Sequence, residues 1–477
     1  MTSSRPPALA AALLLLGLGG CSSSLTPPVA PPVVVPVDWQ HRAAVLPGPR
    51  DSAALVAWWT RFDDPVLTDL ITTALRASPD VRTAFSRLAE SRARRGLAGA
   101  ALLPSLSAGV SGGGTRTRDR LTDVSVSRES YSAALDASWQ VDLFGLQRAT
   151  VAAASADVAQ TEELFYGVRV SLAAEVAAAY VTLRSAEAQL DLVQRALVTR
   201  AEVVQLTHWR EQSGTGDGLD TQQAISNLEQ ARASLPALEL TAAQTRHRLA
   251  LLCGRVPGAL DSLLLPARAV PGPPADFAFG LPTETLRQRP DVRAAEQAVL
   301  AASFRTTAAR RQRWPSFTLT GSIGVTAPHP ASLFSPDSVV ASLLGGLTAP
   351  LFTAGRITQT IAVQTEQEHQ AILAYERTVL TALAEVEDAL IAVQLQNERR
   401  ATLALAVTAA TAAAQFSALR YDAGQVDLFI SLDAQRTLLA LQQQEVASVA
   451  DRATASIRLY QALGGGWSPS ALTASLP

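Results

Sequence analysis

A chain of 477 residues with a formal net charge of −2 is long enough for two or three ordinary domains, and its charge gives no sign of a nucleic-acid partner. Hydrophobic residues make up 48% of the chain but aromatic residues only 5%, and charged residues, at 17%, fall below the roughly one quarter that is usual. The apolar share is mostly alanine, leucine and valine, which favours long helices with small packed side chains over a compact aromatic core.

The N-terminus is typical of an export signal. Arg5 supplies a positive charge, and the apolar stretch from Ala8 to Leu18 is too short to span a membrane, which takes ~20 residues. The stretch ends in Leu18-Gly19-Gly20-Cys21, which resembles the lipobox of bacterial lipoproteins, where the cysteine is lipidated and becomes the mature N-terminus. The alternative is an ordinary signal peptide with an incidental cysteine. We expect residues 1–20 to be a signal peptide and Cys21 to carry the lipid.

Residues 21–50 are expected to form a tether. Residues 26–37 are rich in proline and valine, which favours an extended, polyproline-like segment. Ser22, and not an aspartate, follows Cys21. By analogy with bacterial lipoproteins, in which an aspartate at this position goes with retention at the inner membrane, this favours the outer membrane. Lipid on Cys21 would leave Cys253 as a lone thiol in an apolar helix end, where packing is its expected role.

From Pro79 onward the chain carries the same order of elements twice. Pro79-Asp80-Val81-Arg82 returns as Pro290-Asp291-Val292-Arg293, and a further proline stands 25 residues after the start of each motif, at Pro104 and Pro315. Self-similarity at a period of about 210 residues indicates an internal duplication. Each half is expected to run helix, strand pair, long helix, turn and return helix, so that one chain supplies two pseudo-equivalent sections of a ring or tube.

Four segments alternate apolar and polar residues with the period of two that indicates β-strands. They are residues 105–111, 132–143, 317–325 and 339–351. Gly112-Gly113-Gly114 is expected to begin a polar loop that runs to Ser130, and residues 326–338 are expected to form its counterpart.

One apolar and one polar face suit a soluble sandwich and equally a membrane barrel. Segments of about 9–12 residues have the length of a tilted transmembrane strand. Four strands cannot close a barrel, and lipid does not tolerate open sheet edges, so the barrel interpretation requires several copies of the chain.

Two runs without proline, residues 147–210 and 356–419, predict helices of unusual length, roughly 90 Å each at 1.5 Å per residue. Apolar residues recur in both at steps of four and three, which marks the seam of a supercoil. The alternative is a single long amphipathic helix in a large bundle. It would explain one such run, but it is a weaker explanation for two runs that match across a duplication. The expected return helices are Leu219–Cys253 and Val426–Leu463.

Several motifs occur in the order typical of one family. Trp58-Trp59-Thr60-Arg61-Phe62-Asp63-Asp64-Pro65-Val66-Leu67 resembles its opening signature, and Trp139-Gln140-Val141-Asp142-Leu143-Phe144-Gly145 resembles its strand-to-helix motif. Further matches are Pro350-Leu351-Phe352-Thr353-Ala354-Gly355-Arg356, Glu385-Val386-Glu387-Asp388-Ala389-Leu390, Arg420-Tyr421-Asp422-Ala423-Gly424 and Leu432-Asp433-Ala434-Gln435-Arg436. The ordered set resembles the outer-membrane efflux protein (TolC-like) family, in its lipoprotein branch.

The resemblance implies an α+β membrane protein that works as a homotrimer, with a 12-stranded outer-membrane β-barrel continued by a long periplasmic α-helical barrel. The implied domains are a lipoprotein signal peptide (1–20), a lipidated tether (21–50), a first repeat (51–254), an equatorial connector (255–281), a second repeat (282–464) and an equatorial C-terminal tail (465–477). No cofactor is implied apart from the covalent lipid on Cys21.

The implied role is the passive exit duct of a tripartite pump for drugs or other small solutes. Its partners would be other copies of the chain, a periplasmic adaptor protein, an inner-membrane RND-type transporter that supplies the energy, and outer-membrane lipid. One alternative is the exit channel of a type I protein secretion system, against which the lipobox argues. Another is a periplasmic coiled-coil scaffold lipoprotein whose strands form a small soluble sheet.

The family has a gate at the periplasmic tip, and the resemblance carries it over to four residues. Asp433 matches an inward aspartate that forms a ring, and Phe429, one helical turn earlier, stands where relatives have an apolar constriction. Tyr421 matches a latching tyrosine, and Arg420 neighbours it. Without the resemblance, Asp433 would be interpreted as a solvated carboxylate on a helix surface.

The sequence also departs from the best-known branch. Ile430 replaces a second aspartate and Val426 replaces a latching arginine, so closure is expected to depend more on Phe429.

An enzyme is not expected. The five histidines lack the spacing of a helical metal pair, and neither a Gly-x-Ser-x-Gly elbow nor a phosphate-binding loop is present.

Overall fold

The structure, a computed structural model, describes residues 34–41, 46–47, 55–118, 123, 125–274, 276–277 and 282–467. The predicted signal peptide, Cys21, most of the tether and the last ten residues therefore lie outside the described residues.

The chain forms two compact units, and each draws on both halves of the sequence. The first unit takes in Arg87–Thr161 and Ala294–Tyr375, and the second takes in Val33–Ser86, Glu162–Arg293 and Glu376–Pro477.

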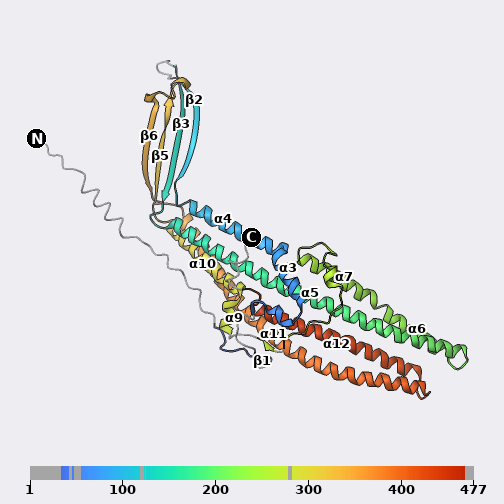
Figure 1. Ribbon diagram of the computed structural model, residues 1–477. Coiled ribbons are helices and arrows are strands. Elements are labelled where there is room, and N and C mark those ends of the chain that lie inside the picture. The colour runs from blue at the N-terminus through green and yellow to red at the C-terminus, as the bar shows by residue number, and fades with distance from the viewer. Residues whose placement is uncertain are drawn as a thin grey trace. The chain divides into compact units, whose positions relative to one another are not determined.

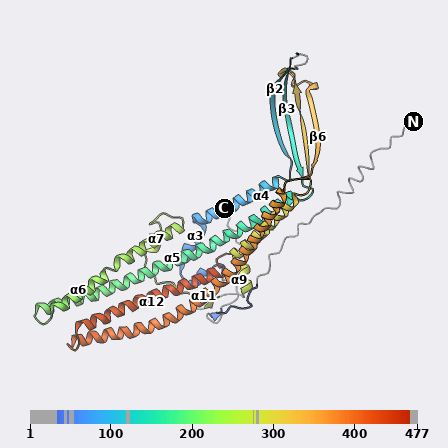
Figure 2. The same cartoon turned by 180° about the vertical axis from the view of Figure 1, so that it is seen from behind.

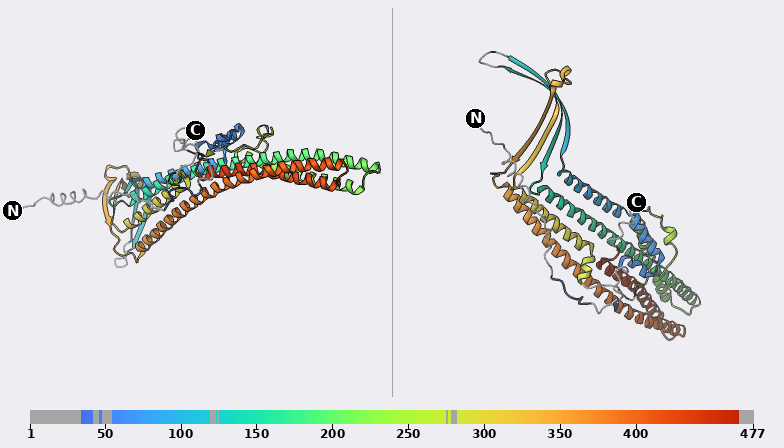
Figure 3. Two further views of the ribbon diagram at one scale, coloured as in Figure 1. Left: turned by 90° about the horizontal axis from the view of Figure 1, so that it is seen from below. Right: turned by 60° about the vertical axis from the view of Figure 1, so that its left-hand side comes forward.

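The first unit contains an antiparallel sheet of four strands in the order β2-β3-β5-β6, which Figure 1 shows side by side and Figure 3 shows with a common curve. The strands are β2 (Ser105–Arg118), β3 (Ser125–Val141), β5 (Ser316–Ala327) and β6 (Val339–Thr348). The predicted strands are confirmed in place and pairing, although β3 and β6 end before Leu143 and Leu351.

The expected polar loop from Gly112 to Ser130 is wrong, because β2 runs through the three glycines and β3 begins at Ser125. The glycines are paired across the hairpin, with Gly112 opposite Tyr131. A Cβ on Gly112 would lie 3.0 Å from the Tyr131 ring, so the ring covers the bare backbone there. The Tyr131 ring on the neighbouring strand provides the packing that Gly112 lacks, so the paired strands of the hairpin continue beyond Gly112.

The strand register gives the sheet one apolar face and one mainly polar face, on which β6 also places Val340 and Leu344. Leu135, Ile323 and Ala341 lie opposite one another in a row, as do Asp136, Ser322 and Ser342 in the next row. The described residues leave the apolar face uncovered: Leu135 is 47% exposed and Ile323 57%.

Four helices adjoin this sheet in the sequence: α4 (Pro79–Ala100), α5 (Leu146–Gln212), α10 (Pro290–Arg311) and α11 (Arg356–Asp422). Within the first unit, Arg95 donates to the Ser155 hydroxyl at 2.9 Å, which joins α4 to α5. Arg305 pairs with Asp157 at 2.6 Å, which joins α10 to α5. The two helices of 67 residues, α5 and α11, confirm the predicted long runs.

The first return helix is broken, against the prediction of one helix over Leu219–Cys253. The structure has α6 (Gly218–Arg232) and α7 (Leu235–Leu252) instead. Pro236 lacks an N–H, and in a continuous helix its ring would clash with the carbonyl of Arg232 four residues earlier, which favours a break at this point. The second return helix, α12 (Leu428–Ala462), is continuous as predicted.

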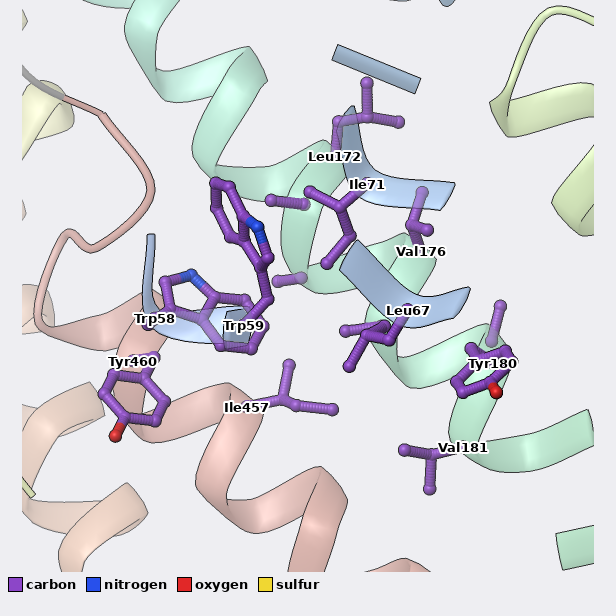
Figure 4. Packing of buried hydrophobic residues seen from close by; sticks show 14 of the residues in the cluster. Trp58, Trp59, Leu67, Ile71, Leu172, Val176, Tyr180, Val181, Ile457 and Tyr460 are labelled. Atoms are coloured by element: carbon purple, nitrogen blue, oxygen red, sulfur yellow. The ribbon is translucent and has the colours of Figure 1, made fainter. Parts of the chain in front are cut away.

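The second unit has a core in which α5 and α12 meet the segment that precedes α4 (Figure 4). That segment is the 3₁₀ helix η2 (Trp58–Phe62) followed by α3 (Pro65–Ala77). Trp58 is fully buried and stacks on Tyr460 of α12 at 5.3 Å between ring centroids. Asp64 caps α3 and accepts a hydrogen bond from the Tyr180 hydroxyl of α5 at 2.8 Å.

The remaining elements are short. They are β1 (Leu46–Pro47), which pairs in parallel with β4 (Asp276–Phe277), and α8 (Asp261–Leu264), α9 (Pro282–Gln288), η3 (Pro330–Ser332) and η4 (Pro336–Ser338).

The described part of the tether is fastened to α11. Trp39 is buried in the core of the second unit. The backbone N–H groups of Gln40 and His41 donate to the Glu387 carboxylate at 2.7 and 3.2 Å, and the His41 ring Nδ1 lies 2.8 Å from the same carboxylate.

Candidate functional site

Two helical hairpins of the second unit end side by side, α5–α6 from the first half and α11–α12 from the second (Figures 1 and 2). Their turns are built alike. Gly214 and Gly424 take left-handed backbone angles, with φ of +70° and +66°, which glycine adopts at little cost. The backbone N–H after each glycine donates to a carbonyl five residues earlier, that of Arg210 or of Arg420. The duplication therefore extends to the helical tip.

Tyr421, the predicted latch residue, joins the two hairpins, but its partner is a residue that the sequence analysis did not identify. The Arg210 guanidinium of α5 lies over the Tyr421 ring, 4.8 Å from its centroid. Nη2 of Arg210 is also 3.8 Å from Oδ1 of Asp422. Arg210 occupies in the first half the position of Arg420 in the second, because both precede their glycine by four residues. That equivalence is the signal by which it could have been found.

Asp433 and Phe429 lie on an exposed face of α12, with Phe429 56% exposed. Their neighbours Leu428 and Leu432 are buried against Ala224 of α6, in a small cluster that also receives Tyr421. The buried leucines fix the rotation of α12, and the predicted gate residues consequently share one uncovered side. Arg420 is exposed at the end of α11.

Three carboxylates gather at the same turns. Asp217 caps α6 by accepting from the Leu219 N–H at 3.1 Å. Burial raises the pKa of the Asp220 carboxyl, and the nearby carboxylates of Asp217 and Asp427 raise it further. The Arg210 guanidinium acts in the opposite direction and lowers that pKa.

A second tie between the hairpins lies further from the turns. Arg200 of α5 is 5% exposed and donates to the backbone carbonyl of Asn227 on α6 at 2.8 Å. Nε of Arg436 on α12 lies 3.4 Å from the Asn227 side-chain oxygen. Burial lowers the pKa of the Arg200 guanidinium, and the positive charge of Arg436 lowers it further. Asn227 thus connects one helix of each half.

Among the described residues no group of three or more His, Cys, Asp or Glu side chains is placed to hold a metal ion. By length and composition alone α5 and α11 could cross a membrane; 61% of the most apolar window of α5 is buried, against 6% of that of α11.

The comparisons with known proteins agree along nearly the whole chain. The sequence profile of the outer membrane efflux protein family matches residues 70–255 and 281–465. The chain is 32% identical to the probable efflux pump outer membrane protein SepC of Pseudomonas putida, over 95% of this chain and 96% of that protein. It is also 32% identical to the pyoverdine export outer membrane protein OpmQ of Pseudomonas putida, with the same coverage.

Solved structures show the same fold. The outer-membrane channel OprN matches with a TM-score of 0.84 and 30% identity, over 92% of this chain and 100% of OprN. The open state of the MtrE outer membrane channel of Neisseria gonorrhoeae matches with a TM-score of 0.78 and 29% identity, over 91% of this chain and 96% of MtrE.

Proposed function

Because the chain belongs to the outer membrane efflux protein family, we propose that it is the outer-membrane channel of a tripartite efflux pump, a passive exit duct for drugs or other small solutes. The relatives named for toluene efflux, antibiotic efflux and pyoverdine export support this role. Its partners are a periplasmic adaptor and an inner-membrane RND-type transporter, which supplies the energy.

Three copies close one barrel of twelve strands, four from each copy. The single observation that carries this proposal is the sheet: among the residues that the structure describes, nothing covers its apolar face, and its edge strands β2 and β6 each pair with one neighbour only. A lipid environment suits the apolar face and requires that the edges be closed. The exposed apolar stretch of α11 supports the same arrangement, because a neighbouring copy would cover it.

The N-terminal segment anchors the trimer. We assign residues 1–20 to a signal peptide and the lipid to Cys21, with residues 21–50 as its tether. The contacts of Gln40 and His41 with Glu387 support a tether that runs along the helical body. Residues 255–281 connect the repeats at 51–254 and 282–464, and together with the C-terminal tail, residues 465–477, they belong to an equatorial belt.

The helical tip is the gate. Asp433 and Phe429 of three copies form rings around the axis, and Tyr421 with Arg210 latches the hairpins of each copy together. Val426 stands where the best-known branch has a latching arginine, and Arg210 supplies the positive charge of the latch in its place. The exposed Arg420 directly precedes Tyr421.

The function is tested by purifying the full chain in detergent. We expect a trimer on unheated denaturing gels and conductance in planar bilayers, and we expect the gene to restore solute resistance to a host that lacks its efflux channel. A monomer without conductance would favour the scaffold alternative, and rescue of protein secretion instead of solute resistance would favour the type I channel.

Asp433→Asn is expected to weaken the block of the channel by divalent cations about tenfold or more, because the ring of three carboxylates loses its negative charge. A tenfold change in cation affinity corresponds to only ~1.4 kcal/mol. Single-channel recording with added Mg²⁺ measures the effect. Asp191→Asn is the control, since Asp191 is exposed and pairs with Arg195 on its own helix. Unchanged block in the Asp433 variant would remove this residue from the gate.

Arg210→Ala is expected to raise the fraction of time that the channel is open. Each copy loses a half-exposed cation–π contact and a long ion pair, together about 1–2 kcal/mol after solvent screening, or about 5–30-fold in the closing equilibrium. Open probability in bilayers measures the change. Arg195→Ala removes an equally cationic side chain whose partner lies on the same helix, and it should leave the opening unaltered.

A further inference from the structure

We propose that a cavity between the two helical hairpins of the second unit binds a small carboxylate with an apolar tail, and that Arg200 holds the carboxylate. Such binding does not depend on transport, so it goes beyond the channel function proposed above. The ligand is defined by its chemistry alone: one negative charge at the end of a short apolar chain.

The cavity has a volume of about 450 Å³, within the range of about 300–1,000 Å³ that is usual for small-molecule sites. Its walls come from α5 of the first hairpin and from α11 and α12 of the second. Part of the wall is apolar and is formed by Leu192, Ala414, Ala418, Leu438 and Leu439. Of the described side chains that line the cavity, two are arginines, Arg195 and Arg200, and none is a carboxylate. Apolar walls combined with positive charge suit an amphipathic anion.

Arg200 brings a buried charge to this cavity. Its side chain is 5% exposed, and Nη1 donates to the backbone carbonyl of Asn227 on α6 at 2.8 Å. No carboxylate among the described residues pairs with it, and the neighbouring charge that acts on it is the positive one of Arg436. A guanidinium stays charged at neutral pH, and a buried charge without a counter-ion is strongly unfavourable. An anion in the cavity compensates this charge.

The residues around Arg200 also supply more hydrogen-bond donors than acceptors. The Asn227 side chain is fully buried, and its amide nitrogen has no hydrogen-bond partner among the described residues. The two oxygens of Asn227 are already used, since the backbone carbonyl accepts from Arg200 and the amide oxygen lies 3.4 Å from Nε of Arg436. The cluster therefore lacks an acceptor, and a carboxylate accepts hydrogen bonds through both of its oxygens.

The second arginine of the lining does not need such a partner. Nη2 of Arg195 lies 2.9 Å from Oδ2 of Asp191 on the same helix, so its charge is already compensated. One uncompensated guanidinium matches one negative charge. A monoanionic carboxylate fits this balance, whereas a doubly charged phosphate would bring an excess of negative charge against the apolar wall.

Calorimetric titration of the full chain, held in an amphipathic polymer, tests the site with octanoate as the probe. We expect octanoate to bind at least tenfold more tightly than 1-octanol, which has the same tail and no charge. Arg200→Gln is expected to weaken octanoate binding at least tenfold, because the carboxylate loses a desolvated charge partner, and to leave 1-octanol binding within twofold. Arg232→Gln is the matched control, since Arg232 pairs with Glu229 on its own helix and does not line the cavity.

Thermal unfolding shows whether the Arg200 variant is folded. Glutamine keeps a donor for the Asn227 carbonyl and removes an uncompensated charge, so without octanoate the variant should unfold at the same temperature as the parent protein or a higher one. Octanoate is expected to raise the unfolding temperature of the parent protein and not that of the variant. Ala418→Phe fills part of the cavity without changing any charge, and it should weaken the binding of octanoate and 1-octanol alike.

Three results would each overturn the site: no binding of octanoate to the parent protein, equal binding of octanoate and 1-octanol, or equal binding of octanoate by the parent protein and the Arg200 variant. A trimer that conducts ions but gives any of these results leaves the proposed function standing. A protein that binds octanoate as expected but does not conduct retains the site and loses the channel.

Discussion

Replacing Ile323 by arginine is expected to remove the assembled protein from the outer membrane, whereas arginine at the adjacent Ser322 is expected to be tolerated. Ile323 lies on the apolar face of the sheet, 57% exposed and in one row with Leu135 and Ala341. A charged side chain that faces lipid costs about 2–4 kcal/mol near the bilayer midplane, and a trimer would meet this cost in each of its three copies.

Ser322 is the matched control because it points to the other face, where it lies opposite Asp136. An arginine there meets a carboxylate and water in the lumen of the proposed barrel. Membrane fractionation and unheated denaturing gels measure both variants. Equal loss in the two variants would show that the faces are assigned wrongly, and equal assembly would show that the apolar face does not meet lipid.

Trp58→Ala is expected to destabilise the second unit by about 3–5 kcal/mol, the usual cost of deleting a buried aromatic side chain. Trp58 is fully buried and stacks on Tyr460 (Figure 4). It also makes edge contacts with Trp59 and Phe62, both at 5.8 Å between ring centroids. Its indole nitrogen has no hydrogen-bond partner among the described residues, so the loss is one of packing.

Trp58→Phe separates packing from other effects, since it keeps an aromatic ring and should cost about half as much or less. Unfolding by guanidinium, followed by far-ultraviolet circular dichroism in detergent, gives the difference. If the alanine variant unfolded at the same denaturant concentration as the parent protein, the η2 segment would not be part of the stabilising core.

The strands and long helices could be predicted because their patterns are local. Period-two alternation identified the apolar face that the register of Leu135 with Ile323 confirms, and the lack of proline identified α5 and α11. The extension of β2 beyond Ser111 and of β3 before Ser132 was not predicted, because three consecutive glycines are typical of a turn. Only the folded hairpin brings the Tyr131 ring over the bare backbone of Gly112, and that contact joins residues on different strands.

The tip was only partly predictable. A family resemblance led to Tyr421, Asp433 and Phe429, but the partner of Tyr421 comes from the other half of the chain, and no local pattern pairs residues 211 positions apart. The break between α6 and α7 was missed for a different reason. Pro236 stands within an apolar helical pattern that by itself predicts one continuous helix, whereas the missing N–H of the proline interrupts it.

The contacts of the N-terminal segment with α11 also constrain the order in which parts of the chain can fold. Synthesis delivers Gln40 and His41 early, but their acceptor Glu387 follows 346 residues after His41. Both compact units likewise need segments from the two ends of the duplication. Neither unit can therefore be completed while the chain is still half made, and the nascent polypeptide must be kept unaggregated until α11 has emerged.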